Sequence, residues 1–306
     1  MNASLLFAQA LNGLQLGVLL FLLSAGLTLV LGIMNFVNLA HGSLFMMGAY
    51  FAAAAFGATQ SFLLAGVAAV GGTLALGVAV ERFVLARLYQ RDHLYQVLGT
   101  FGLILVFNEV ARFVWGQAPV FMTVPEMLAG TVQLGPVAFP AYRLAIIVVG
   151  LLVGVALYLV IHRTRAGMLI RAGASDPQML SALGVDNGLV SALVFAVGAA
   201  LAGLAGLMAG PILTVQPGMG EPILILALVV LITGGIGSIR GAFYGALLVG
   251  VVDTIGRAFL PGLLREVVER SFAQNAGPAI ASMLIYFLMA AVLAFRPAGL
   301  FPVKHG

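Results

Sequence analysis

The sequence predicts an all-α polytopic membrane protein with about eight or nine transmembrane helices. Of its 306 residues, 62% are hydrophobic and only 8% are charged, whereas about 25% of the residues in a soluble domain are charged. At roughly 20 apolar residues per span, a chain of this length holds eight or nine spans and leaves little for a soluble domain. We therefore expect a single transmembrane domain over residues 1–306, embedded in a lipid bilayer.

Apolar windows place the individual spans along the chain. The amino-terminal apolar run lacks the basic residues that open a signal peptide, so we expect it to remain as the first span. Residues 222–234 are few for a full crossing, so this segment or the next one could be re-entrant or a broken helix. The expected spans cover 7–31, 42–58, 62–80, 96–115, 142–162, 188–210, 222–234, 242–258 and 278–295.

The distribution of Arg and Lys predicts the orientation. Cytoplasmic loops of membrane proteins carry an excess of these residues, and one set of loops holds nine of them against five in the other. With nine crossings, this difference places the C-terminus in the cytoplasm. Because these residues lie in short loops, the net charge of +4 indicates membrane topology and not nucleic-acid binding. The nine are Arg82, Arg87, Arg91, Arg163, Arg165, Arg171, Arg240, Arg296 and Lys304, and the five are Arg112, Arg143, Arg257, Arg265 and Arg270.

Two polar, glycine-rich stretches interrupt the apolar pattern, at 32–42 and 233–241. Backbone released by such breaks is tolerated at membrane depth only where protein buries it or where it lines a water-filled path. Paired interruptions of this kind are typical of transporters built from internal repeats. Ordinary tight turns at the cytoplasmic face are the alternative. Elsewhere, Gly and Ala recur every three or four residues along 198–210, which predicts a close helix–helix packing face.

The sequence holds no motif for nucleotide binding, metal binding or hydrolysis. Lys304 is the one Lys, and no Walker-type loop surrounds it. Cys is absent, the four His are scattered, and no Gly-x-Ser-x-Gly elbow occurs. We therefore expect that the chain is not an enzyme and has no catalytic residue, no metal site and no cofactor.

Three carboxylates near the spans could couple transport to an ion gradient. Glu109 lies three residues before Arg112, and Asp253 lies four residues before Arg257, so each can pair on its own helix. Glu221 lies at an expected helix start, where the helix dipole favours an anion. These structural roles account for all three, and a gradient-driven secondary transporter of small solutes remains the alternative function.

The longest polar loop, about 162–187, contains a short helix. Asp176 followed by Pro177 is typical of an N-cap with proline at the first helical position, and Gly184 is typical of a helix end. An amphipathic helix that presents Leu and Met to the cytoplasm suits insertion into a groove of a partner protein, and lying on the lipid surface is the alternative. The apolar face consists of Met179, Leu180 and Leu183.

Motifs in a fixed order along nearly the whole chain resemble one family. They are Gly32-Ile-Met-Asn-Phe-Val-Asn-Leu-Ala-His-Gly42, Arg171-Ala-Gly-Ala-Ser-Asp-Pro-Gln178, Gly234-Gly-Ile-Gly-Ser238 and Phe295-Arg-Pro-Ala-Gly-Leu-Phe301. Together they are similar to those of the branched-chain amino acid ABC-importer permeases. Close relatives of this family handle urea, short amides or aromatic acids, so the motifs leave the solute open.

The resemblance implies a permease subunit in the bacterial inner membrane, forming half of a translocation path for branched-chain or related small amino acids. It implies as partners a homologous second permease, two ATPase subunits, and a periplasmic or extracellular solute-binding protein. The residues expected to couple to the ATPase are Arg171, Asp176, Pro177, Met179, Leu180, Leu183 and Gly184. Those expected along the translocation path are Asn35, Asn38, His41, Gly235, Gly237 and Ser238.

Overall fold

The computed structural model describes residues 3–89, 91–267 and 270–302, so Lys304 lies outside the described residues. Within these ranges, eight helices are long and apolar enough to cross a membrane, which confirms the predicted all-α polytopic fold. They are α1 (Ala3–Met34), α2 (His41–Thr59), α3 (Phe62–Phe83), α4 (His93–Trp115), α5 (Ala141–Arg163), α8 (Asn187–Ala209), α10 (Ile239–Val267) and α11 (Arg270–Phe295).

Several shorter elements complete the fold. The apolar helix α9 (Gly220–Gly234) has 15 residues and therefore spans about 22 Å, less than the roughly 30 Å of a hydrocarbon core. The amphipathic helix α6 (Arg165–Ser175) and the short α7 (Pro177–Ala182) lie between α5 and α8. The strands β1 (Thr131–Leu134) and β2 (Val137–Pro140) form an antiparallel hairpin, with Thr131 opposite Pro140. Single 3-10 turns occupy Leu85–Arg87 and Glu126–Leu128.

The last two long helices extend beyond the apolar windows. α10 continues to Val267 and contains Pro261, while α11 begins at Arg270 and contains Pro278. The windows stop where charged residues and proline lower the hydropathy, although the helical backbone continues beyond those residues.

The long helices pack around α1 and α8. α1 contacts α5, α8, α9 and α10, and α8 also contacts α2 and α3. Both are largely buried, whereas α3, α4, α5 and α11 expose most of their apolar windows. In a bilayer such apolar surface faces lipid or another membrane protein.

Glycines of α8 permit these close contacts, as the spacing of small residues predicted. A Cβ added at Gly198 would lie 3.1 Å from the carbonyl oxygen of Gly26 on α1. A Cβ at Gly203 would lie 2.8 Å from the carbonyl oxygen of Ala69 on α3. The backbones of α8 and its neighbours therefore touch directly.

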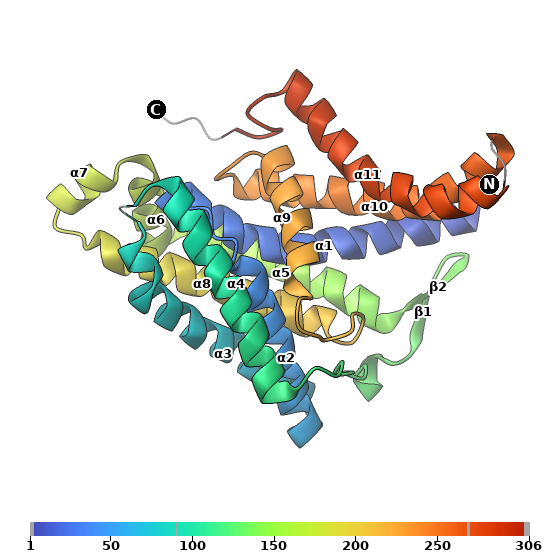
Figure 1. Ribbon diagram of the computed structural model, residues 1–306, viewed down its shortest axis with the longest axis horizontal. Helices are drawn as coiled ribbons and strands as arrows, with labels where there is room; N and C mark the ends of the chain where they lie inside the picture. Colours follow the sequence, from blue (N-terminus) through green and yellow to red (C-terminus); the bar gives the residue numbers. More distant parts are fainter. Residues whose placement is uncertain (1–2, 90, 268–269, 303–306) are drawn as a thin grey trace.

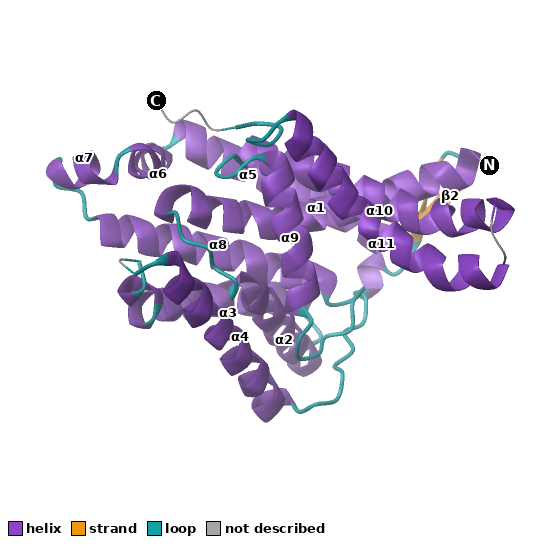
Figure 2. Ribbon diagram, turned by 45° about the horizontal axis from the view of Figure 1, so that its top comes forward, coloured by secondary structure: helices purple, strands orange, loops and turns teal. Residues whose placement is uncertain are grey.

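The two ends of the molecule differ in character. Figures 1 and 2 both show α7 at one end of the long axis and the β1–β2 hairpin with the start of α1 at the other. The end of α1, the end of α5 and the turn between α9 and α10 border one cavity together with α6, the helix before α7.

Candidate functional site

A cavity of about 650 Å³ opens at the α7 end of the molecule. Its walls come from the end of α1, the end of α5, helix α6 and the turn between α9 and α10. It brings together three of the residues expected along a translocation path and one from the expected coupling loop. These are Asn35, Gly237, Ser238 and Arg171.

The two glycine-rich breaks meet at this cavity. A Cβ added at Gly32 would lie 2.8 Å from the Cα of Gly237, so the end of α1 lies directly against the α9–α10 turn. Asn35 has φ +46° and Gly237 has φ +80°, a left-handed conformation that glycine and asparagine tolerate best. Both breaks are therefore tight turns between helices, and they also border the cavity.

The other residues expected along the path lie elsewhere. Asn38 is buried, and its Oδ1 accepts a hydrogen bond from the Ala40 amide at 3.0 Å, ahead of α2. His41 is fully buried, and its Nε2 donates to the carbonyl oxygen of Leu23 at 3.2 Å. Asn38 therefore stabilises the turn before α2, His41 ties the start of α2 to α1, and neither lines the cavity.

Gly235 binds the C-terminal segment. It has φ +109°, and a Cβ there would lie 2.9 Å from the carbonyl oxygen of Phe301. The amides of Leu300 and Phe301 donate to the carbonyl oxygens of Thr233 and Gly234 at 3.0 and 2.9 Å. This contact ties the segment after α11 to the end of α9.

Arg171 connects the coupling loop to the cavity. It projects from α6, and its guanidinium donates to the carbonyl oxygen of Ile161 near the end of α5. The start of α6 is capped by Thr164, whose hydroxyl accepts from the Gly167 amide at 3.1 Å. A shift of α6 therefore moves a charged group in the cavity wall.

The helix α7 forms where Asp176 and Pro177 indicate. The Asp176 carboxylate accepts from the amides of Gln178 and Met179 at 3.0 and 2.9 Å, and Gly184, just beyond the helix, has φ +82°. These are the N-cap and helix end that the residue types indicate.

The predicted apolar face of α7 needs a correction. Met179 and Leu183 are 59% and 74% exposed, but Leu180 is only 4% exposed and belongs to the apolar core. On a helix of under two turns, neighbouring apolar positions diverge by about 100° each. Leu180 therefore fastens α7 to the protein, and only Met179 and Leu183 are open to a partner.

The three carboxylates near the spans all have partners. Glu109 pairs with Arg112 on α4, and Asp253 pairs with Arg257 on α10 at 2.9 Å, which confirms both predicted pairs. Glu221 accepts from the Asn108 amide of α4 at 2.6 Å, a contact that the sequence did not indicate.

Sequence reasoning missed a polar group beside the cavity. Arg240 donates to the Tyr158 hydroxyl at 3.0 Å and lies 5.4 Å from the centre of its ring. Tyr158 also stacks on His162, with ring centres 4.2 Å apart. The positions 158 and 162 share a face of α5, and that spacing was the available signal.

A second missed contact lies at the same end. Glu81 of α3 is buried and accepts from the Tyr89 hydroxyl at 3.1 Å. Burial, and then the neighbouring Glu81 charge, raise the pKa of Tyr89 well above its usual range. Tyr89 therefore stays a neutral hydrogen-bond donor and holds the turn after α3 in place.

Comparisons of the sequence with known proteins find components of transport systems. Residues 9–293 match the family described as the branched-chain amino acid transport system permease component. The chain is 30% identical over 307 residues to the high-affinity branched-chain amino acid transport system permease protein BraD of Pseudomonas aeruginosa, covering 95% of this chain and 94% of the relative.

Two further relatives come from a bacterium and an archaeon. The identity to the high-affinity permease protein LivH of Escherichia coli is 30% over 276 residues, covering 85% of this chain and 89% of the relative. It is 26% over 246 residues to the probable LivH of Methanocaldococcus jannaschii, covering 78% and 76%. No solved structure matches the chain.

Proposed function

This chain belongs to the branched-chain amino acid transport permease family, and from this premise we propose that it is the membrane-spanning subunit of an ATP-driven importer. It forms half of the translocation path for branched-chain or related small amino acids. Residues 1–306 act as one transmembrane domain, and the chain itself catalyses no reaction.

The shared cavity is the observation that carries the proposal. Arg171 of α6 lines the same space as Asn35 and Ser238 from the two breaks. The loop that holds α6 and α7 therefore forms part of the wall through which solute leaves. A partner that binds one position of this loop more tightly than another shifts the cavity between two states.

The exposed residues of α7 give that partner a contact. Met179 and Leu183 present apolar side chains at the tip of the molecule, and Leu180 anchors the helix from below. A rigid apolar knob of this kind fits a groove on an ATPase subunit. ATP-driven closure of two such subunits then moves α7 and, through α6, the cavity wall.

The remaining partners follow from the membrane arrangement. The apolar faces of α3, α4, α5 and α11 suit lipid and a homologous second permease chain. The end with the β1–β2 hairpin faces a periplasmic or extracellular solute-binding protein, and the C-terminus lies in the cytoplasm of a bacterial inner membrane. The excess of Arg and Lys on the α7 side supports this orientation.

The decisive experiment is affinity purification of the full chain from its native membranes in mild detergent. We expect a second permease and a Walker-type ATPase to co-purify, and the preparation to hydrolyse ATP. Recovery of this chain alone, with uptake driven by a proton or sodium gradient after reconstitution, contradicts the proposal.

Two variants test the coupling contact within that experiment. Met179→Asp and Leu183→Asp each place a charge in an apolar contact, so recovery of the ATPase should fall about tenfold or more. Met127→Asp is the control, because Met127 is also exposed but lies in the 3-10 turn between α4 and α5, far along the chain from α7. Normal ATPase recovery with both α7 variants rules out this docking surface.

A further inference from the structure

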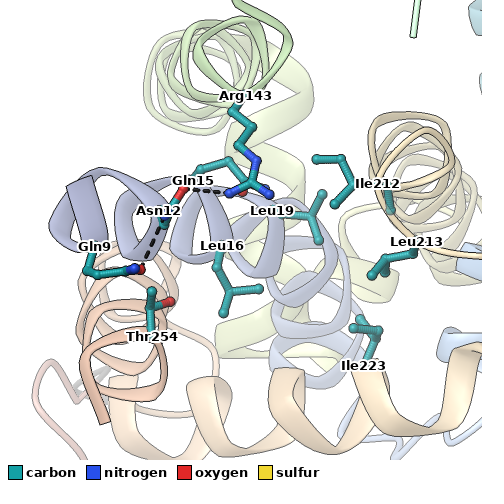
Figure 3. Close-up of a pocket in the computed structure, with 11 residues that line it drawn as sticks. Gln9, Asn12, Gln15, Leu16, Leu19, Arg143, Ile212, Leu213, Ile223 and Thr254 are labelled. Carbon is teal, nitrogen blue, oxygen red and sulfur yellow. Dashed lines mark hydrogen bonds between the residues drawn. The ribbon is translucent and has the colours of Figure 1, made fainter. Parts of the chain in front are cut away.

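A second cavity, of about 290 Å³, lies in the half of the molecule that holds the start of α1. α1, the first turn of α5, the segment after α8, and helices α9 and α10 surround it (Figure 3). It is smaller than the roughly 300–1,000 Å³ pockets that hold drug-sized ligands, so it suits a small solute. The orientation proposed above places it on the outer side of the membrane.

One end of this cavity carries a cation without a counter-ion. Arg143 of α5 reaches toward α1, where its Nη1 donates to the Asn12 Oδ1 at 2.6 Å, as Figure 3 shows. Asn12 in turn donates to the Gln9 Oε1 at 3.2 Å. Among the described residues, no carboxylate pairs with Arg143. Neutral amides therefore orient the guanidinium, and its positive charge remains free to bind an anionic ligand.

Gln15 adds an unused amide beside that cation. Its residue surface is 7% exposed, and it lines the cavity next to Asn12. In the described part of the chain, its amide makes no hydrogen bond. Its amide atoms are not sealed from solvent but open onto the cavity. A ligand in the cavity can therefore form a hydrogen bond with this amide.

The other end of the cavity is aliphatic. Leu16 and Leu19 of α1 face Ile212, Leu213 and Ile223 across the space (Figure 3). The site thus offers a planar cationic fork and amides at one end, and branched apolar side chains at the other. A small ligand that matches both ends has a carboxylate and a short branched aliphatic chain.

We propose that this cavity is a transit site for an aliphatic amino acid, with Arg143 binding its carboxylate. The guanidinium pairs with a carboxylate through two parallel hydrogen bonds, while Gln15 and Thr254 offer neutral acceptors to the ammonium group. Among the described residues no acidic side chain lines the site, so binding is weak and the solute can leave. The choice of an amino acid as ligand rests on the proposed function.

The chain has no Cys, which allows a direct test on the full-length protein. In the variants Leu213→Cys and Thr254→Cys, each thiol lies on the cavity wall, and its rate of reaction with a water-soluble thiol reagent is measured. We expect leucine at the concentration that half-fills the site to halve both rates. Leucinamide, which lacks the carboxylate, should leave both rates unchanged.

The role of Arg143 is then tested in the same two backgrounds. Arg143→Gln should raise the leucine concentration needed for half-protection about tenfold, because it removes a charge-assisted hydrogen bond. Arg265→Gln, an exposed Arg near the end of α10, should leave protection intact. Met127→Cys, outside the cavity, should react equally fast with and without leucine.

The outcomes separate this inference from the proposed function. Equal protection by leucinamide, or full protection in Arg143→Gln, overturns the carboxylate site. Absence of leucine protection at both cavity positions also overturns it, even if the ATPase co-purifies. Protection in a chain that recovers no ATPase upholds the site while the importer proposal fails.

Discussion

Gly203 sets the distance between three helices at the centre of the molecule. A Cβ at this position would meet the Ala69 carbonyl oxygen of α3 at 2.8 Å. From the other side, a Cβ at Gly48 of α2 would meet the Gly203 carbonyl oxygen at 2.7 Å. Real Cβ atoms do not approach backbone atoms this closely, so α2, α3 and α8 must separate if either glycine gains a side chain.

We expect Gly203→Val to destabilise the protein by about 1–3 kcal/mol, the usual effect of overpacking a core. The apparent melting temperature of the purified chain, followed by size-exclusion chromatography after heating, should fall clearly.

Gly71→Val is the matched control for this change. Gly71 is an exposed glycine of α3 with no atom near its Cβ position, so its melting temperature should match that of the parent chain. Equal stability of the Gly203 and Gly71 variants contradicts the packing argument.

For individual residues, contacts within one helix could be predicted from the sequence, and contacts between distant parts of the chain could not. The pairs Glu109–Arg112 and Asp253–Arg257 follow from helical spacing alone. The hydrogen bond from Asn108 to Glu221 joins residues 113 positions apart, and nothing in either neighbourhood indicates it. Leu180 shows the same limit, because periodicity defines a helix face but not the side that meets the core.

The helix α7 depends on its cap more than on its length. A helix of six residues is far too short to be stable by itself. It is held by the Asp176 carboxylate, which accepts from two amides of its first turn, and by the burial of Leu180. Loss of either support releases the segment that carries Met179 and Leu183.

We expect Asp176→Ala to weaken α7 by about 1 kcal/mol, a typical loss for an N-cap. Amide hydrogen exchange at Gln178 and Met179 should accelerate about fivefold, while Asp176→Asn retains slow exchange because asparagine also caps.

Asp186→Ala is the control for the loss of the α7 cap. Asp186 caps α8 through the amides of Gly188 and Leu189, so its loss should accelerate exchange there and leave α7 unchanged. If amide exchange in α7 is unchanged in Asp176→Ala, the cap contributes nothing and packing alone accounts for the stability of the helix.

Hydropathy predicted the long helices but missed the elements between them. The spans start and end within a few residues of the apolar windows, except at α10 and α11. The helix α6 escaped notice because Gly167 and Gly173 weaken its helical signal. In the fold, Gly167 lies against the carbonyl oxygen of Ile161 on α5. Packing against α5 therefore stabilises a helix that its glycines disfavour. The β1–β2 hairpin has Gly135 at φ +61° in its turn. Its strands of four residues are too short to register in windows sized for a membrane span.

The arrangement of the whole molecule follows from contacts that sequence does not encode locally. Spans and their order could be predicted, because each crossing needs its own apolar run. The cavity at the α7 end could not, because its walls come from four separate parts of the chain. Of the residues chosen from the breaks, Asn35, Gly237 and Ser238 reach that cavity, whereas Asn38 and His41 lie buried in the packing around α2.

The two ends of the molecule should face opposite sides of the membrane. Leu183 directly follows α7, and Met127 lies in the segment between α4 and the β1–β2 hairpin. Because the chain lacks Cys, single Cys variants at these positions report each side without background.

In intact cells, a membrane-impermeant thiol reagent should label Met127→Cys at once and Leu183→Cys only after permeabilisation. Labelling in the reverse order would place the α7 loop outside, where an ATPase has no access to it. The positive-inside asymmetry argues against that order, and an inverted result would overturn both the orientation and the coupling role of α7.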